Sequence, residues 1–112
     1  MTDPIREIDV QHAARLTEAG QALLLDVRED DEWAAGHVPG AMHMALGRLD
    51  PTALDPHTPI IAICRSGARS GKATARLAAA GLSVRNMAGG LTAWQQSGLP
   101  VIGEDGSPGT TT

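Results

Sequence analysis

Residues 64–70, which read CRSGARS, bring a thiol, two guanidinium groups and a glycine together in one short segment. The apolar run at residues 60–63 precedes Cys64, and the pattern after it predicts a helix from Ser70. Cys64 is therefore expected at the C-terminal end of a strand, the edge of an open α/β sheet where ligands bind. A loop entering a helix leaves backbone N–H groups without partners, and Gly67 permits a turn that directs them at an anion. The segment predicts an anion-binding loop that begins with a cysteine.

The neighbours of Cys64 predict that its thiol ionises readily. A helix N-terminus and nearby cations, here Arg65 and Arg69, lower a cysteine pKa from about 8.5 to about 3.5–7.5. Such a thiolate is a nucleophile that needs no dedicated general base. A single cysteine is by default a small buried hydrophobe, but its place at the start of this loop favours catalysis. As the sequence holds one cysteine, no internal disulfide is expected, which suits a reducing cytosol.

The length of the loop helps to choose between phosphorus and sulfur chemistry. Tyrosine and dual-specificity phosphatases resemble this layout, but they place five residues between Cys and Arg and usually a His before the Cys. Here four residues separate Cys64 from Arg69, and Ile63 precedes Cys64. The shorter loop forms a smaller cradle, which suits thiosulfate better than a phosphate monoester. A phosphatase or arsenate reductase is the alternative that this spacing disfavours.

Four motifs occur in order along the sequence: Asp26-Val27-Arg28 with Glu32-Trp33; GHVPGA at 36–41; CRSGARS at 64–70; and NMAGGL at 86–91 with Ala93-Trp94, closing on GLPV at 98–101. With these motifs, the sequence over about residues 5–102 resembles a single-domain rhodanese, of the thiosulfate sulfurtransferase-like family. One departure is Trp33, where the family often has Phe or Tyr.

The resemblance implies an α/β fold, a rhodanese-like five-stranded and mainly parallel sheet flanked by helices. It also implies a sulfurtransferase reaction in which Cys64 is catalytic. The thiolate attacks the outer sulfur of thiosulfate, sulfite leaves, and a Cys64 persulfide passes its sulfur to cyanide or a thiol. The substrate-binding residues implied are Arg65, Ser66, Gly67, Ala68, Arg69 and Ser70, with the backbone N–H groups holding the anion and the two arginines binding thiosulfate.

The lone cysteine also bears on partners. Without a second cysteine the persulfide cannot be resolved internally, so the acceptor must come from outside the chain. Small-molecule sulfur donors, a thiol or cyanide acceptor, and a protein sulfur acceptor fit this interpretation. A non-enzymatic persulfide carrier or sulfur sensor that docks to a partner protein is the alternative of a different class. The sequence names neither the physiological donor nor the acceptor.

Other polar residues are expected to support the loops. Asp26, Arg28 and Glu32 predict a structural ion pair at the end of a buried strand, and His37 a hydrogen bond that fixes its Gly/Pro loop. The four histidines and Cys64 show no metal-ligand spacing, so no metal is predicted. Gly89-Gly90 lacks the surrounding pattern of a nucleotide loop and predicts a tight turn between strand and helix. No cofactor is expected.

The elements that position these residues alternate between strand and helix, which predicts an α/β fold with a mainly parallel sheet. The run ALLLDV at 22–27 and the run IIAI at 60–63 suit strands buried on both faces. A loop with a helical turn is expected at 46–54. The predicted strands are 5–8, 22–27, 42–45, 60–63 and 84–87, and the predicted helices are 10–19, 30–35, 70–80 and 92–97.

Length and composition limit the class of protein. The 112 residues suffice for one domain, expected at 5–102, with the polar segment 103–112 predicted as a disordered tail. A net charge of −4 without a basic stripe argues against nucleic acid and anionic membrane as partners. No secretory signal and no membrane-spanning run is visible, so a cytoplasmic location is expected.

Overall fold

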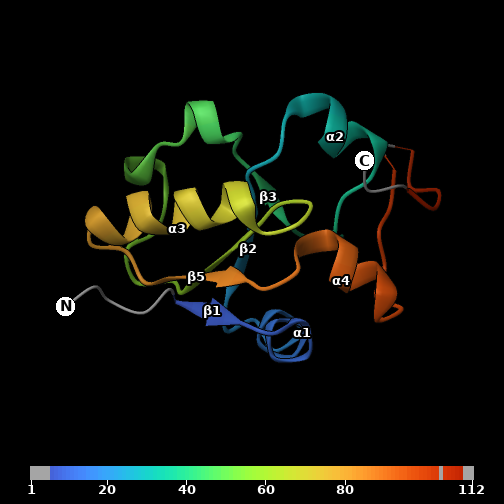
Figure 1. Ribbon diagram of the computed structural model, residues 1–112, viewed down its shortest axis with the longest axis horizontal. Helices are drawn as coiled ribbons and strands as arrows, with labels where there is room; N and C mark the ends of the chain where they lie inside the picture. Colours follow the sequence, from blue (N-terminus) through green and yellow to red (C-terminus); the bar gives the residue numbers. More distant parts are fainter. Residues whose placement is uncertain (1–5, 104, 110–112) are drawn as a thin grey trace.

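The computed structural model describes residues 6–103 and 105–109, and in this part of the chain five parallel strands form one sheet in the order β1-β5-β4-β2-β3. The predicted α/β fold with a parallel sheet is confirmed (Figure 1). The strands are β1 (Glu7–Ile8), β2 (Leu23–Asp26), β3 (Met42–His43), β4 (Ile60–Ile63) and β5 (Val84–Met87). The helices are α1 (Val10–Glu18), α2 (Asp30–Ala35), α3 (Ala68–Ala79) and α4 (Gly90–Gln96), with 3₁₀ turns η1 (Leu46–Arg48) and η2 (Pro51–Ala53).

Helices cover both faces of the sheet and enclose two apolar clusters. On one face α1 and α4 pack around Ile61, Ile63 and Trp94, and on the other α3 packs around Ile60 and Ala62. All four residues of β4 are buried, because this strand is central and has helices on both sides. The continuous apolar run that predicted a doubly covered strand is thereby explained.

The register of the strands brings the polar segments to one edge of the sheet. Asp26 at the end of β2 pairs with Ile63 at the end of β4, so the chain leaves both strands at the same level. On the other side of β4, Asn86 of β5 pairs with Ala62. Cys64 therefore emerges between the segment that follows β2 and the last residues of β5.

Two helices begin earlier than the sequence predicted. The helix expected from residue 70 begins at Ala68, and the helix expected from residue 92 begins at Gly90. In each case the residue before the helix is a glycine in the left-handed region, Gly67 with φ 108° and Gly89 with φ 77°, so the chain turns into the helix abruptly. Ser70 consequently lies within the first turn of α3 and is buried.

The segment after α4 returns along the GHVPGA loop. Ile102 exchanges two backbone hydrogen bonds with His37, at 2.8 and 2.9 Å. Within the predicted tail, Gly103 donates to the Ser107 carbonyl at 2.7 Å, and Gly109 donates to the Val101 carbonyl at 3.1 Å. Residues 104 and 110–112 lie outside the described residues, as do residues 1–5, so the domain and tail boundaries stay a prediction. Among the described helices, none combines the length and the apolar character required to cross a membrane.

Candidate active site

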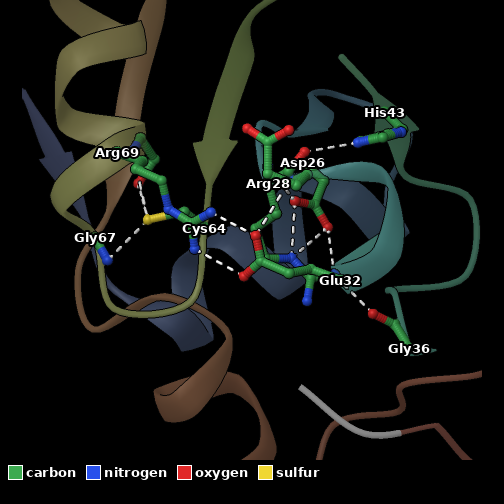
Figure 2. A network of polar contacts seen from close by, with 10 residues as sticks. Asp26, Arg28, Glu32, Gly36, His43, Cys64, Gly67 and Arg69 are labelled. Carbon is green, nitrogen blue, oxygen red and sulfur yellow. Dashed lines mark hydrogen bonds and ion pairs between the residues drawn. The ribbon is translucent and has the colours of Figure 1, made fainter. Parts of the chain in front are cut away.

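Cys64 follows β4 directly, and its sulfur is surrounded by hydrogen-bond donors of the loop. The Sγ atom accepts from the Gly67 N–H at 3.1 Å, the Ser70 N–H at 3.4 Å and the Ser70 hydroxyl at 3.2 Å. Figure 2 shows the loop curling around this sulfur atom. The residue is only 1% exposed. Because α3 begins at Ala68, the N–H groups at its start lack intrahelical partners, and those of Gly67 and Ser70 donate to the sulfur instead.

These contacts favour the thiolate over the thiol. Burial raises the pKa of Cys64, but the Ser70 hydroxyl and the N–H groups of Ser70, Gly67 and Ser66 lower it, and the net effect is a lowered pKa. Arg69 is within electrostatic reach, since the Cys64 charge contributes, after Glu32, to raising the Arg69 pKa. The predicted acidic thiol is thus supported chiefly by hydrogen bonds from the loop.

The N-terminus of α4 is hydrogen-bonded to the cysteine loop. Leu91 N–H donates to the Cys64 carbonyl at 2.9 Å, and Thr92 donates to the Arg65 carbonyl from both its N–H and its hydroxyl at 3.1 Å. Gly90 permits this approach, because a Cβ atom there would lie 2.5 Å from both carbonyl oxygens. The sequence predicted only a tight turn at Gly89-Gly90, since nothing local indicates that this turn lies against the cysteine loop.

Arg69 and Glu32 form a two-point ion pair that connects α3 to α2. Nη1 lies 2.5 Å from Oε1, and Nη2 lies 2.9 Å from Oε2 (Figure 2). The hydrogen bonds from Arg69 are the main reason that the pKa of Glu32 falls to about 2. Sequence reasoning grouped Glu32 with Asp26 and Arg28, and Arg69 with the substrate. In the structure both nitrogens of the Arg69 fork contact Glu32.

Asp26 and Arg28 form a separate ion pair that is fully buried. Arg28 Nη2 lies 2.8 Å from Asp26 Oδ2 and also donates to the Gly36 carbonyl at 2.6 Å. His43 donates from Nε2 to the Arg28 carbonyl at 2.7 Å. These bonds connect the end of β2 to the end of α2 and to β3, and the arrangement fits the bracing role that stays a prediction for Asp26 and Arg28.

His37 contacts its own loop and the aromatic ring next to it. Its Nδ1 donates to the Trp33 carbonyl at 2.8 Å, and its ring stacks on the Trp33 indole at 3.8 Å between centroids. His43 stacks on Trp33 as well, at 4.9 Å. The placement fits the predicted loop-fixing hydrogen bond. Among the residues with described positions, no group of three or more His, Cys, Asp or Glu side chains could hold a metal ion.

Asn86 is part of the site, although the sequence placed it only within a motif. Its side chain is buried on β5, where Nδ2 donates to the Gly67 carbonyl at 3.0 Å and Oδ1 accepts from the Ser70 hydroxyl at 2.5 Å. Both partners are themselves donors to Cys64. The signal available in the sequence was an amide in a predicted strand beside the apolar residues Val84 and Met87, but only the pairing of β5 with β4 brings it beneath the loop.

Fold and site together define a class of protein: a parallel α/β domain with one cysteine at the end of its central strand, whose sulfur is surrounded by N–H and hydroxyl groups of the following loop. Comparison with known proteins identifies the family. Residues 9–97 match the family described as the Rhodanese-like domain, and the chain belongs to that family.

Similar proteins agree with this assignment. The chain is 34% identical to Thiosulfate sulfurtransferase 18 of Arabidopsis thaliana over 123 aligned residues, covering 95% of this chain and 90% of the plant protein. It is 36% identical to a sulfurtransferase of Allochromatium vinosum, covering 91% and 99% of the two chains. The crystal structure of a rhodanese-related protein from Thermoplasma volcanium superposes with a TM-score of 0.80 at 26% identity, covering 87% and 97%.

Proposed function

We propose that this chain is a sulfurtransferase in which Cys64 carries sulfane sulfur as a persulfide from a small-molecule donor to an external acceptor. The observation that carries the proposal is the set of three donor contacts on the Cys64 Sγ at the C-terminal end of β4. These donors favour the thiolate over the thiol, so the nucleophile forms without a separate general base. Membership of a family whose similar proteins are named sulfurtransferases supports the same conclusion.

Thiosulfate is the donor that we propose. The Cys64 thiolate attacks its outer sulfur, a new S–S bond forms, and the old S–S bond breaks as sulfite leaves with the electron pair. The negative charge then resides on the outer sulfur of the persulfide. We propose that the N–H groups of residues 65–70, of which those of Gly67 and Ser70 already donate to Sγ, stabilise this charge, because preorganised donors stabilise charge where it develops.

Arg65 is the cation that we assign to the sulfonate end of the donor. Its side chain is exposed on the loop, and in the described part of the chain no ion pair engages it. Arg69, by contrast, already contacts Glu32 through both nitrogens of its fork. We therefore propose that Arg65 contacts the anion directly. Arg69, held in place by Glu32, attracts the anion only through the long-range field of its charge.

The acceptor comes from outside the chain, because Cys64 is the only cysteine in the sequence. Cyanide or a thiol attacks the outer sulfur of the persulfide, and the thiolate of Cys64 is regenerated. The products are thiocyanate or a new persulfide. A reducing cytoplasm is the compartment that we propose, since it keeps the nucleophile as a free thiol.

The first test is an intact-mass measurement after the protein is incubated with thiosulfate and, separately, with a low-molecular-weight persulfide. The second is a colorimetric assay of thiocyanate after cyanide is added. We expect the mass of one sulfur atom on Cys64 and turnover to thiocyanate, both lost in Cys64→Ser. Absence of the mass gain with every donor would refute the proposal. Slow turnover with free donors but stoichiometric transfer to one protein would favour a carrier, and Cys64-dependent hydrolysis of an aryl phosphate would favour a phosphatase.

A further inference from the structure

Asn86 binds two of the groups that donate to Cys64, yet it does not itself contact the sulfur. Its Nδ2 holds the Gly67 carbonyl at 3.0 Å, and its Oδ1 lies 2.5 Å from the Ser70 hydroxyl oxygen. The residue is 5% exposed. Nothing in the reaction proposed above requires an amide at this position.

The partners of Asn86 determine which way its amide points. The Gly67 carbonyl can only accept, so the amide nitrogen must face it and the amide oxygen must face Ser70. A carbonyl oxygen has no proton to donate. The bond across the 2.5 Å contact is therefore made only while the Ser70 hydroxyl hydrogen points at Asn86 and not at the sulfur.

The same hydroxyl is also needed by the thiolate. Ser70 has one hydroxyl hydrogen, and its oxygen lies 3.2 Å from the Cys64 Sγ. When Cys64 is a thiol, its S–H donates to the Ser70 oxygen while the hydroxyl donates to Asn86. When Cys64 is a thiolate, the hydroxyl must turn from Asn86 to the sulfur. Asn86 and the thiolate consequently compete for one proton donor.

We propose that Asn86 is a positioning residue for Cys64, binding the Ser70 hydroxyl whenever Sγ is uncharged and releasing it whenever Sγ is a thiolate. Sγ is uncharged in the thiol and also in the persulfide, where the charge has moved to the outer sulfur. Asn86 thus favours both of these states over the thiolate. The statement about the persulfide rests on the proposed function, whereas the statement about the thiol does not.

Few other charged groups lie near enough to the sulfur to alter the balance between the Cys64 thiol and thiolate. Arg65 and Arg69 lie on the loop and α3, and Glu32 on α2 binds Arg69. The Asp26–Arg28 pair follows β2, Arg85 on β5 is exposed, and α4 carries no charged side chain. Among the described residues, no hydrogen bond connects any of these charged side chains to Ser70 or Asn86.

The experiment is a double-mutant cycle on the Cys64 pKa, read from the pH dependence of alkylation by iodoacetamide. In Asn86→Ala the Ser70 hydroxyl is free to serve the thiolate, so we expect the pKa to fall by about 0.5–1. In the Ser70→Ala background the same substitution should cause no such fall. In the Ser70→Thr background, which keeps a hydroxyl, the fall should return. Asn86→Asp should raise the pKa, because a carboxylate retains the hydroxyl and adds negative charge.

If Asn86 only fixed the Gly67 carbonyl in place, Asn86→Ala would shift the Cys64 pKa in the opposite direction. Losing that bond would loosen the Gly67 N–H that donates to sulfur, and the pKa would rise in Asn86→Ala whether or not Ser70 is present. A rise, or an equal change in both backgrounds, would overturn the proposal. If Asn86→Ala does not give a cooperative thermal unfolding transition, Asn86→Leu, which is close in size, provides the same comparison.

A second measurement tests the persulfide. In mixtures of thiosulfate and sulfite at a pH above the Cys64 pKa, the ratio of persulfide to thiolate should be about three- to tenfold lower in Asn86→Ala than in the unmodified chain. An unchanged ratio would overturn this part of the proposal. If no variant forms a persulfide, the proposed function fails, while the alkylation cycle still decides the role of Asn86.

Discussion

Glu32 and Arg69 lie 37 residues apart in the sequence and meet beside Cys64 in a two-point ion pair of 2.5 and 2.9 Å. The pair joins α2 to the first turn of α3. It also neutralises one of the two cations of the cysteine loop, so that a dianionic donor meets less positive charge than the sequence CRSGARS suggests.

Replacing Glu32 should therefore change the preference between donors. In Glu32→Gln the charge of Arg69 is no longer neutralised, and we expect kcat/KM for thiosulfate to rise about three- to tenfold relative to that for an uncharged organic sulfane donor. The measurement is steady-state kinetics with both donors. Asp30→Asn is the matched control, because Asp30 forms an ion pair with Arg48. An equal fall in kcat/KM for both donors would show that Glu32 only positions the loop.

The same pair predicts how stability depends on pH. The pKa of Glu32 is lowered from about 4.5 to about 2, so its stabilisation is fully present above about pH 5 and is lost as the pH falls towards 2. With allowance for solvent screening at Arg69, we expect about 1–2 kcal/mol at pH 7. Urea unfolding of the unmodified chain and Glu32→Gln should give curves that converge between about pH 5 and pH 2. A constant difference would contradict the assignment.

Gly90 should tolerate no side chain, because a Cβ atom would overlap the Cys64 and Arg65 carbonyl oxygens at 2.5 Å. We expect Gly90→Ala to cost about 3 kcal/mol in unfolding free energy and to raise the Cys64 pKa as the loop shifts. Gly20→Ala is the control, since Gly20 has a similar positive φ but no atom within 4 Å of the new Cβ. Thermal unfolding and alkylation kinetics distinguish the two, and equal effects would exclude the overlap as the cause.

Much of the fold followed from local patterns in the sequence. The apolar run at β4 and the alternation of elements predicted the parallel sheet, since burial on both faces requires a continuous apolar segment. Cys64 and its loop were equally evident, because a thiol, a glycine and two arginines occur consecutively. These features were recognisable because the physics that produces them acts between neighbours in the chain.

The rest of the site depends on contacts between distant segments. Glu32 approaches Arg69 only because α2 packs beside the start of α3, and Asn86 reaches Ser70 only because β5 pairs with β4. The early start of α3 depends on the left-handed conformation of Gly67, which propensity alone does not give. Periodicity locates elements, but it does not specify which polar side chains will meet.

The buried pair of Asp26 and Arg28 gives a last prediction, on stability. Both side chains are 0% exposed, and in the structure as described for residues 6–103 and 105–109 Arg28 Nη1 has no hydrogen-bond partner. Removing one partner leaves an uncompensated buried charge, so Asp26→Asn should lower the unfolding free energy by about 3–5 kcal/mol. The double variant Asp26→Leu with Arg28→Met, which removes both charges, should lose less than Asp26→Leu or Arg28→Met alone. Urea unfolding at pH 7 measures the unmodified chain and these four variants, and additive losses in the double variant would show that the two groups act independently.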